Sequence, residues 1–345
     1  MQKGRTFSRM LRHKAAPLLV ILIVLVIVTM ILSSGVLDGR PFSAMFSRGF
    51  LANGNLLSIF YKLVIQSCMI CGLALILIGG NIDLSVAGQA GICSMVFAWM
   101  CQNTQLHWGI IFAIALVMGA CLGLINTFLI NILKFPPFIA TVGMTTIYGG
   151  VCNIMTAGNN IQVVRRGVIA LGEAKVFGFI PVMFLIAAAI MIIYQFILSR
   201  TSFGRSIFMC GGNASAARLS GLNPDRVRMI LYVNNGVLAS LGGLFYTAQV
   251  KLASPTSILQ SGFDFRVISA SILGGVAFRG GSGSIGGAFI ALVLLNVFEN
   301  MLYVLRANEY WIIVASGVLL VVALLIDYVS EERRRKAMII AATSK

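Results

Sequence analysis

The sequence predicts an all-α polytopic membrane protein with about ten transmembrane helices, some of them broken or re-entrant at glycine-rich segments. Of its 345 residues, 59% are hydrophobic and only 10% are charged, whereas soluble domains carry about 25% charged residues. Apolar runs long enough to cross a bilayer, which takes about 20 residues, recur along the whole chain. Short glycine-rich breaks interrupt several of these runs, as in helices that bend or re-enter.

The apolar runs divide the chain into ten expected spans, and two basic tails flank them. The tails are residues 1–14 and 329–345, and the transmembrane domain is 15–328. Spans two to five resemble spans seven to ten in layout, which suggests an internal duplication. Gly119 and Gly123 have the spacing of a close-packing pair between helices. The expected spans are 17–32, 56–78, the small-residue run up to 100, 108–133, 138–155, 177–198, 229–250, 265–278, 285–305 and 310–328.

The positive charge lies next to the predicted spans. The formal net charge is +16, and the stretches 1–14, 198–228 and 331–345 together hold 15 of the 26 Lys and Arg residues. Cytoplasmic loops of membrane proteins carry such an excess. We therefore expect both termini and the loop 199–228 to be cytoplasmic. A nucleic-acid-binding function is disfavoured, because no predicted soluble domain is large enough to carry a basic face with stacking aromatics.

The polar segment 211–228 contains the signals of a short capped helix. Asn213 is suited to the N-cap, 214–219 to the helix body, and Gly221 to a left-handed stop. Asn223 or Asp225 can then cap the next helix, in whose first turn a proline is tolerated. A compact helix between two spans is suited to docking a soluble partner, although composition alone equally allows an ordinary polar loop.

Asp83 follows the glycine-rich break at the end of the second span. A carboxylate at membrane depth is costly, and it marks either a transport pathway or a structural partner. Because non-helical backbone surrounds Asp83, we favour capping of the following helix by Asp83 or Ser85 over direct contact with a substrate. Glu299, with Asn296 and Asn300 on nearby turns, is a second candidate of the same kind.

Several motifs associated with enzymes or metals lack the context they need. Gly281, Gly283 and Gly286 match a dinucleotide-binding pattern, but apolar spans replace the required strand and βαβ unit. No P-loop sequence occurs, so we expect no ATP hydrolysis by this chain. Cys68 and Cys71 form a C-x-x-C pair without a second pair or a nearby His, which favours helix packing over a metal site.

Four motifs together resemble those of a known family. They are GGNIDLSVAG, PPFIATVGMTTIYGG, GGNASAARLSGLN and ILGGVAFRGGSGSIGGAF. The chain resembles the permease subunits of bacterial ABC importers for ribose, galactosides and xylose, which share an ancestor with the branched-chain amino acid permeases. The motifs occur in the expected order and cover most of residues 56–325. Asn81 departs from the family pattern, which has a small residue there.

The resemblance implies a multi-pass subunit of the bacterial inner membrane that moves a monosaccharide. Its partners would be a second permease subunit, a cytoplasmic ATPase and a periplasmic or lipid-anchored binding protein, with ATP–Mg bound by the ATPase and no cofactor on this chain. The coupling helix, which would lie in a cleft of the ATPase, involves Asn213, Ala216, Ala217, Arg218, Leu219, Ser220, Gly221 and Asn223. The translocation pathway or helix break involves Gly79, Gly80, Asn81, Asp83, Ser85, Thr141 and Met144.

Other functions stay open on the sequence alone. The solute could be a nucleoside or an autoinducer sugar, and the second permease could be another copy or a paralogue. An ion-coupled secondary carrier would usually place several ionisable residues along its pathway, whereas Asp83 and Glu299 are the main acidic candidates here. A membrane scaffold or receptor would show no transport at all.

Overall fold

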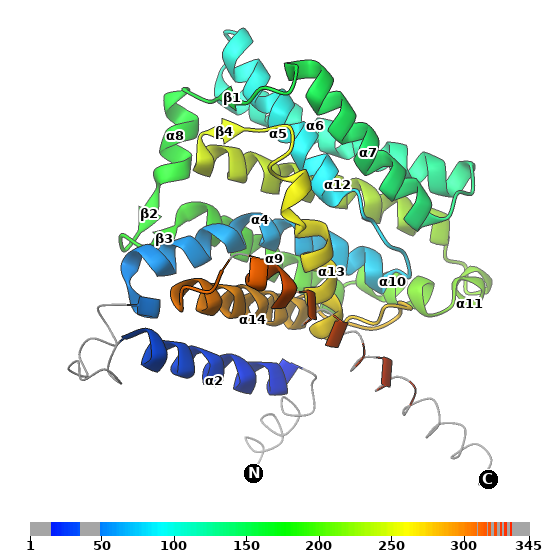
Figure 1. The fold of residues 1–345 in the computed structure, drawn as a ribbon. Helices are drawn as coiled ribbons and strands as arrows, with labels where there is room; N and C mark the ends of the chain where they lie inside the picture. Colours follow the sequence, from blue (N-terminus) through cyan, green and yellow to red (C-terminus); the bar gives the residue numbers. More distant parts are fainter. Residues whose placement is uncertain are drawn as a thin grey trace.

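A computed structural model shows a bundle of helices with two small two-stranded sheets at one end (Figure 1). It describes residues 15–34 and 49–308, and some residues between 310 and 332. The tail 1–14 and most of 329–345 lie outside the described residues. The helices are α2 (Ala15–Ser34), α4 (Asn53–Ile78), α5 (Val86–Asn103), α6 (Trp108–Thr127), α7 (Pro137–Thr156), α8 (Arg166–Glu173), α9 (Val182–Arg200), α10 (Ser202–Gly212), α11 (Ala214–Leu219), α12 (Pro224–Val250), α13 (Phe263–Leu273) and α14 (Ile285–Val304).

Short elements complete the chain. A π-helical turn, η3 (Phe128–Ile132), follows α6, and the 3-10 turns are η2 (Gly49–Leu51) and η4 (Leu259–Ser261). Strand β1 (Ile161–Gln162) pairs antiparallel with β4 (Leu252–Ala253), and β2 (Lys175–Val176) pairs antiparallel with β3 (Ile180–Pro181). These strands and α8 lie at one end of the bundle, and α11 projects at the other (Figure 1). We call these the α8 end and the α11 end.

Helix α4 is the buried centre of the fold. All of its residues from 63 to 78 are buried, and α9, α12, α13 and α14 pack around it. A helix that is hydrophobic on all sides belongs in the interior, and α4 carries apolar residues around its whole circumference. The polar side chains of α4 therefore need partners on the surrounding helices.

Helix α12 packs against α6 through glycines. A Cβ atom on Gly119 would fall 2.4 Å from the Gly236 carbonyl oxygen, and one on Gly123 would fall 2.3 Å from the Tyr232 carbonyl oxygen. Small residues allow backbones to approach this closely. The close-packing pair predicted from the sequence is thereby confirmed, and its partner is α12.

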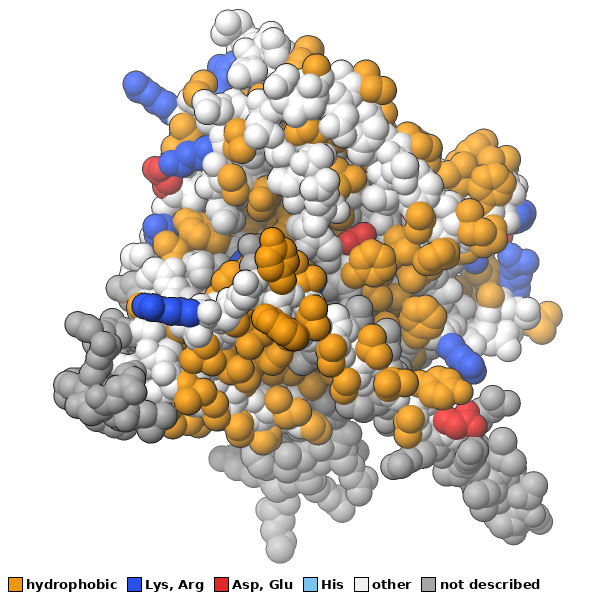
Figure 2. Space-filling view, viewed as in Figure 1, with side chains coloured by type: hydrophobic (Ala, Val, Ile, Leu, Met, Phe, Trp, Pro, Cys, Tyr) orange, Lys and Arg blue, Asp and Glu red, His pale blue; other side chains and the backbone are white. Residues whose placement is uncertain are grey.

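The described residues contain seven helices long and apolar enough to cross a membrane: α2, α4, α6 with η3, α7, α9, α12 and α14. Hydrophobic side chains cover most of the face between the two ends, and Lys and Arg side chains gather near both ends (Figure 2). The third expected span corresponds to α5, which is buried within the bundle. The tenth is described only in part, so the count of ten stays a prediction.

Two expected boundaries were wrong. The eighth span was expected over 265–278, but α13 has 11 residues, a length of about 16 Å that falls short of the roughly 30 Å hydrocarbon core. The sixth was expected from Phe177, but helix α9 begins at Val182, because Gly178, with φ +78°, turns the β2–β3 hairpin. The segment 157–176, which the sequence predicts to be a polar loop, contains the helix α8.

Candidate coupling surface and polar centre

The segment between α10 and α12 forms the capped helix that the sequence predicts. The Asn213 side chain accepts a hydrogen bond of 3.0 Å from the backbone N–H of Ala216, which caps α11. Gly221 has φ +83°, and the Leu222 N–H donates to the Ala217 carbonyl, which closes the C-terminal turn. Asn223, rather than Asp225, caps α12 by accepting from two backbone N–H groups.

Helix α11 presents an apolar side chain outward and buries another. Leu219 is 92% exposed, whereas Ala217 is buried against the hydrophobic core. Arg218, Ser220 and Gly221 are exposed around Leu219. A leucine so fully exposed on a two-turn helix at the end of a membrane bundle is suited to a pocket on a soluble partner, because docking would remove it from water.

Ion pairs and the side-chain amide of Asn131 connect α11 to α12 and to the end of α6. Arg218 Nη2 lies 3.0 Å from Asp225 Oδ2, and Arg228 Nη1 lies 3.5 Å from Asp225 Oδ1. Arg228 also donates to Asn131 Oδ1 at 2.8 Å, and Asn131 Nδ2 donates to the Asp225 carbonyl at 2.8 Å. The start of α12 is thus tied to the π-helical end of α6. A displacement of α11 would therefore act on both helices.

Three pairs of glycines meet beside the start of α11, and we call them the glycine node: 79–80 after α4, 211–212 at the end of α10, and 280–281 before α14. The Gly281 N–H donates to the Ile78 carbonyl at 2.8 Å. A Cβ atom on Gly280 would fall 2.6 Å from the Gly80 Cα atom. Gly281, the first glycine of the dinucleotide-like pattern, therefore allows contact between backbones.

Asp83 is completely buried and lies at the centre of a polar cluster. Its Oδ1 accepts from the Ser85 backbone N–H at 2.8 Å and from Ser85 Oγ at 2.5 Å, and its Oδ2 accepts from Asn235 Nδ2 at 2.9 Å. Ser85 Oγ in turn accepts from Gln89 and Asn126 at 2.7 Å each. This cluster connects the break after α4 with α5, α6 and α12.

The expected capping by Asp83 is corrected by this geometry. Ser85 is the N-cap residue of α5, but it makes no side-chain cap hydrogen bond to the helix. Asp83 accepts from the N–H of the cap residue itself, one position before the helix. Its other oxygen is taken by Asn235, which sequence reasoning had not selected. Asp83 therefore connects the segment before α5 to α12, in addition to its contact with the N-cap residue of α5.

Helix α7 holds the segment around Asp83 through the backbone of Leu84. The Leu84 N–H donates to Thr141 Oγ1 at 3.1 Å, and Thr145 Oγ1 donates to the Leu84 carbonyl at 2.7 Å. Met144 is buried in the hydrophobic core beside them. Gly79 ends α4 as its C-cap, and the Asn81 side chain donates back to the Gly79 carbonyl. The candidates around Asp83 thus converge on one helix break.

Glu299 lies in a different place, towards the α8 end. Glu299 Oε1 and Arg266 Nη2 are 2.8 Å apart, which links α14 to α13. Asn300 and Asn55 exchange two hydrogen bonds, and Asn296 donates to Gln66 at 2.6 Å. This second polar group therefore fastens α13 and α4 to α14.

Sequence reasoning missed the polar residues that complete the Asp83 cluster. Gln89, Asn126 and Asn235 are fully buried, and each lies within a predominantly apolar stretch of the sequence. Polar side chains inside predicted spans are a signal of such a cluster, since hydrocarbon offers them no partner. Their mutual contacts depend on how α5, α6 and α12 pack.

Comparison with known proteins identifies the family of this chain. The family model described as "Branched-chain amino acid transport system / permease component" matches residues 55–324. The chain belongs to this family. The match covers the bundle from α4 through α14, including the glycine node, the Asp83 cluster and the coupling segment. The protein is thus a multi-pass membrane permease component.

Curated relatives of similar length are also permease components. The chain is 30% identical over 273 residues to an autoinducer 2 import system permease protein, LsrC, from Klebsiella pneumoniae, covering 79% of this chain and 78% of that one. It is 29% identical over 289 residues to a probable ABC transporter permease protein, YphD, from Escherichia coli, covering 84% and 86%. The LsrC protein of Yersinia enterocolitica is 29% identical over 269 residues, covering 78% and 74%. No solved structure matches the chain.

Proposed function

We propose that this chain is the translocating subunit of an ABC importer for a monosaccharide-like solute, driven by a separate ATPase that binds α11. The observation that carries the proposal is the projecting helix with its exposed Leu219, capped at both ends and tied to α6 and α12. The similarity to permeases named for autoinducer 2 import supports a small polar solute, and an autoinducer 2-like molecule is the first alternative to a simple sugar.

The mechanism follows from the contacts of the coupling segment. Closure of two ATPase subunits on ATP would move the α11 helices of two permeases towards each other. Each displacement would pass through the Asp225 contacts to α6 and α12, and through the glycine node to α4 and α14. Alternating access of this kind is a rigid-body movement of packed helices around a central path. The α11 end would then be cytoplasmic, with the basic loop 199–228 on the inside.

A second permease subunit is expected to pack on the exposed face of α7. Gly143, Thr146, Ile147 and Gly150 lie on that face, and a Cβ atom on either glycine would meet nothing within 4 Å. Exposed glycines in a membrane helix favour close helix contact. A second copy of this chain is the simplest partner, and a paralogue is the alternative.

Uptake by reconstituted complexes tests the proposal. The permease, with the ATPase and binding protein from its genetic neighbourhood, should take up a monosaccharide or an autoinducer 2-like solute only when ATP is present. A cysteine in place of Leu219 should crosslink to the ATPase and not to an external reagent in intact cells. Uptake driven by an ion gradient without the ATPase would instead indicate a secondary carrier and reject the proposal.

A further inference from the structure

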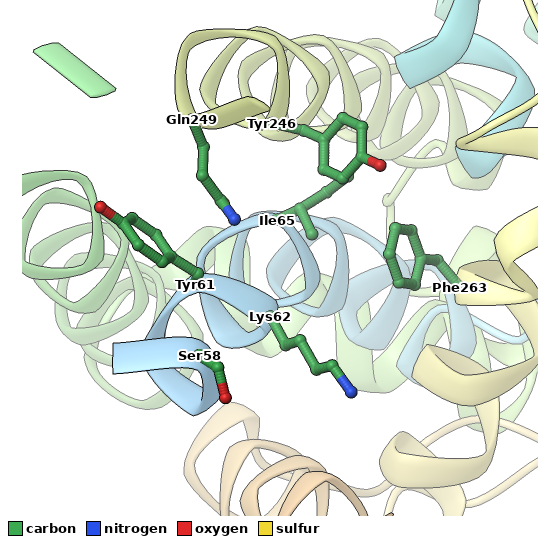
Figure 3. A pocket seen from close by; sticks show the side chains of 7 residues that line it. All are labelled: Ser58, Tyr61, Lys62, Ile65, Tyr246, Gln249 and Phe263. Atoms are coloured by element: carbon green, nitrogen blue, oxygen red, sulfur yellow. The ribbon is translucent and has the colours of Figure 1, made fainter. Parts of the chain in front are cut away.

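A cavity of about 250 Å³ lies between α4, α12 and α13 near the α8 end (Figure 3). Pockets for drug-sized ligands span about 300–1,000 Å³, so this one is suited to a smaller solute. None of the candidate pathway residues around Asp83 lines it. Its walls are formed by Ser58, Tyr61, Lys62, Ile65, Tyr246, Gln249 and Phe263.

The cavity lies at the opposite end of the molecule from the coupling helix. Helix α12 begins beside α11 at Pro224 and reaches the cavity with Tyr246 and Gln249. Under the proposed function, on which this inference rests, that end faces outward, where an importer first receives its solute. The cavity is therefore on the entry side of the bundle.

The side chains around the cavity combine aromatic surfaces with a few polar groups. The rings of Tyr246 and Phe263 lie on one side, and the Gln249 amide points in from α12 (Figure 3). Gln249 Oε1 is buried and has no hydrogen-bond partner. The amide nitrogen is the atom that points into the cavity (Figure 3). Rotation about the last bond of the side chain would exchange the two amide atoms, and a ligand hydroxyl group could then satisfy the costly unpaired acceptor. The Tyr61 hydroxyl, by contrast, points away and donates to the Gly172 carbonyl at 3.3 Å.

The charges near the cavity restrict the ligand further. Lys62 Nζ lies 4.7 Å from the centre of the Tyr303 ring, and the nearby carboxylate of Glu299 is paired with Arg266. A ligand ammonium group would face the Lys62 ammonium group, and the nearby Glu299 carboxylate is already engaged with Arg266. A fully ionised phosphate or carboxylate could accept from Lys62 but could not donate to Gln249 Oε1. Hydroxyl groups can do both.

We propose that this cavity binds a neutral polyhydroxylated solute of monosaccharide size, with Gln249 accepting from one hydroxyl group, Lys62 donating to another, and the Tyr246 and Phe263 rings covering the C–H face of the sugar. The site would hold the solute within one subunit at the entry side of the transport path. Aromatic side chains with a few placed polar groups are the general composition of small-molecule sites.

Binding to the full chain in lipid nanodiscs tests this site. Saturation-transfer NMR, which detects weak binding, is recorded with D-ribose, D-xylose and D-galactose, and with L-leucine as a zwitterionic comparison. Gln249→Leu removes the amide and keeps the bulk, and Gln102→Leu makes the same change on an exposed residue of α5 outside the cavity. Ser58→Trp is a second variant, which fills the mouth of the cavity from an exposed helix position.

At least one sugar should give a signal that falls fivefold or more in Gln249→Leu and in Ser58→Trp, and that stays within twofold in Gln102→Leu. No sugar signal, a signal that both cavity variants leave unchanged, or a leucine signal lost in the same variants would overturn the assignment. ATP-driven uptake separates the two proposals. Normal sugar uptake by the Gln249→Leu complex at every concentration would reject the cavity and leave the proposed function intact, whereas absence of sugar uptake by the wild type would reject the proposed solute class.

Discussion

Gly211 in α10 lies against Ile78 at the end of α4 so closely that a Cβ atom on Gly211 would fall 1.9 Å from the Ile78 carbonyl oxygen. The neighbouring Gly212 has more room, because its Cβ atom would lie 3.9 Å from the nearest heavy atom, the Gly281 Cα. This difference makes the two adjacent glycines a matched pair for testing the glycine node.

Gly211→Ala should disturb the node, and Gly212→Ala should be tolerated. The first change forces the backbones of α4 and α10 apart, since a carbonyl oxygen cannot yield as a flexible side chain can. We expect Gly211→Ala to lower ATP-driven uptake at least tenfold, and Gly212→Ala to stay within twofold of the wild type. Uptake by reconstituted complexes measures both. Equal activity of the two variants would show that the close contact is unimportant for coupling.

Leu219→Ser should weaken ATPase docking without unfolding the permease. Leu219 is almost fully exposed, so its replacement removes little packing within this chain. We expect thermal unfolding of the isolated permease to be unchanged and co-purification of the ATPase to fall. Leu106→Ser, which makes the same change at an exposed leucine away from α11, is the control. Wild-type ATPase binding by Leu219→Ser would contradict the docking role of α11.

Asn213→Ala should destabilise α11 itself. Loss of an N-cap costs about 1 kcal/mol, and the 3.0 Å hydrogen bond to Ala216 is the cap of this short helix. We expect faster backbone hydrogen exchange confined to α11, with reduced coupling of ATP hydrolysis to uptake. Gly221→Val should act in the same direction, because φ +83° disfavours a β-branched residue. Unchanged exchange in both variants would indicate that the coupling segment is held mainly by its ion pairs.

Asp83→Ala should be more damaging than Asp83→Asn. The alanine variant leaves the Ser85 N–H, the Ser85 hydroxyl and the Asn235 amide without their acceptor, and each buried unpaired group costs about 1–3 kcal/mol. The asparagine variant keeps one acceptor oxygen. Unfolding in detergent should show a large loss of stability for alanine and a smaller one for asparagine. If asparagine retains stability but loses uptake, the carboxylate has a role in transport as well.

The Arg266–Glu299 ion pair should be more costly to break than to replace. Glu299 is buried and lies 2.8 Å from Arg266, and removing one partner of a buried pair costs about 3–5 kcal/mol. We expect Arg266→Met alone to destabilise the protein more than the double variant Arg266→Met with Glu299→Gln. The free energy of unfolding in detergent is measured for the wild type, the two single variants and the double variant, and their differences give the coupling energy of the pair. Strict additivity would show that the pair is not coupled.

Glu173 should make the α8 end sensitive to acid. A hydrogen bond of 2.5 Å from Lys251 and the charge of that lysine lower the pKa of Glu173 below its ordinary value of 4.5. Because the folded pKa is the lower one, the contact stabilises at pH values above the ordinary pKa and is lost as the pH falls through the folded pKa. Protection of the α8 amides against hydrogen exchange, relative to the intrinsic exchange rate at each pH, should therefore fall below about pH 4.5. Glu173→Gln should remove this dependence, and Lys175→Gln should largely preserve it.

Much of the fold could be predicted because its determinants are local. The caps at Asn213 and Asn223 and the left-handed Gly221 specify α11 and the start of α12 within a few residues of sequence. Seven of the ten predicted spans correspond to long apolar helices among the described residues for the same reason. Helix α8 was missed because its amphipathic pattern is short, and the length of α13 was overestimated because apolar residues continue past the end of the helix.

The function of the polar residues could be predicted only in part. From the sequence alone, Asp83 could be placed at a break within the membrane region and 213–221 could be predicted as a short capped helix, since both depend on neighbours along the chain. The contacts of Asn235 with Asp83, of Arg266 with Glu299, and among the glycines of the node are seen only in the folded structure. Those contacts join residues from separate helices, and their geometry depends on how closely the backbones pack, which no local pattern encodes.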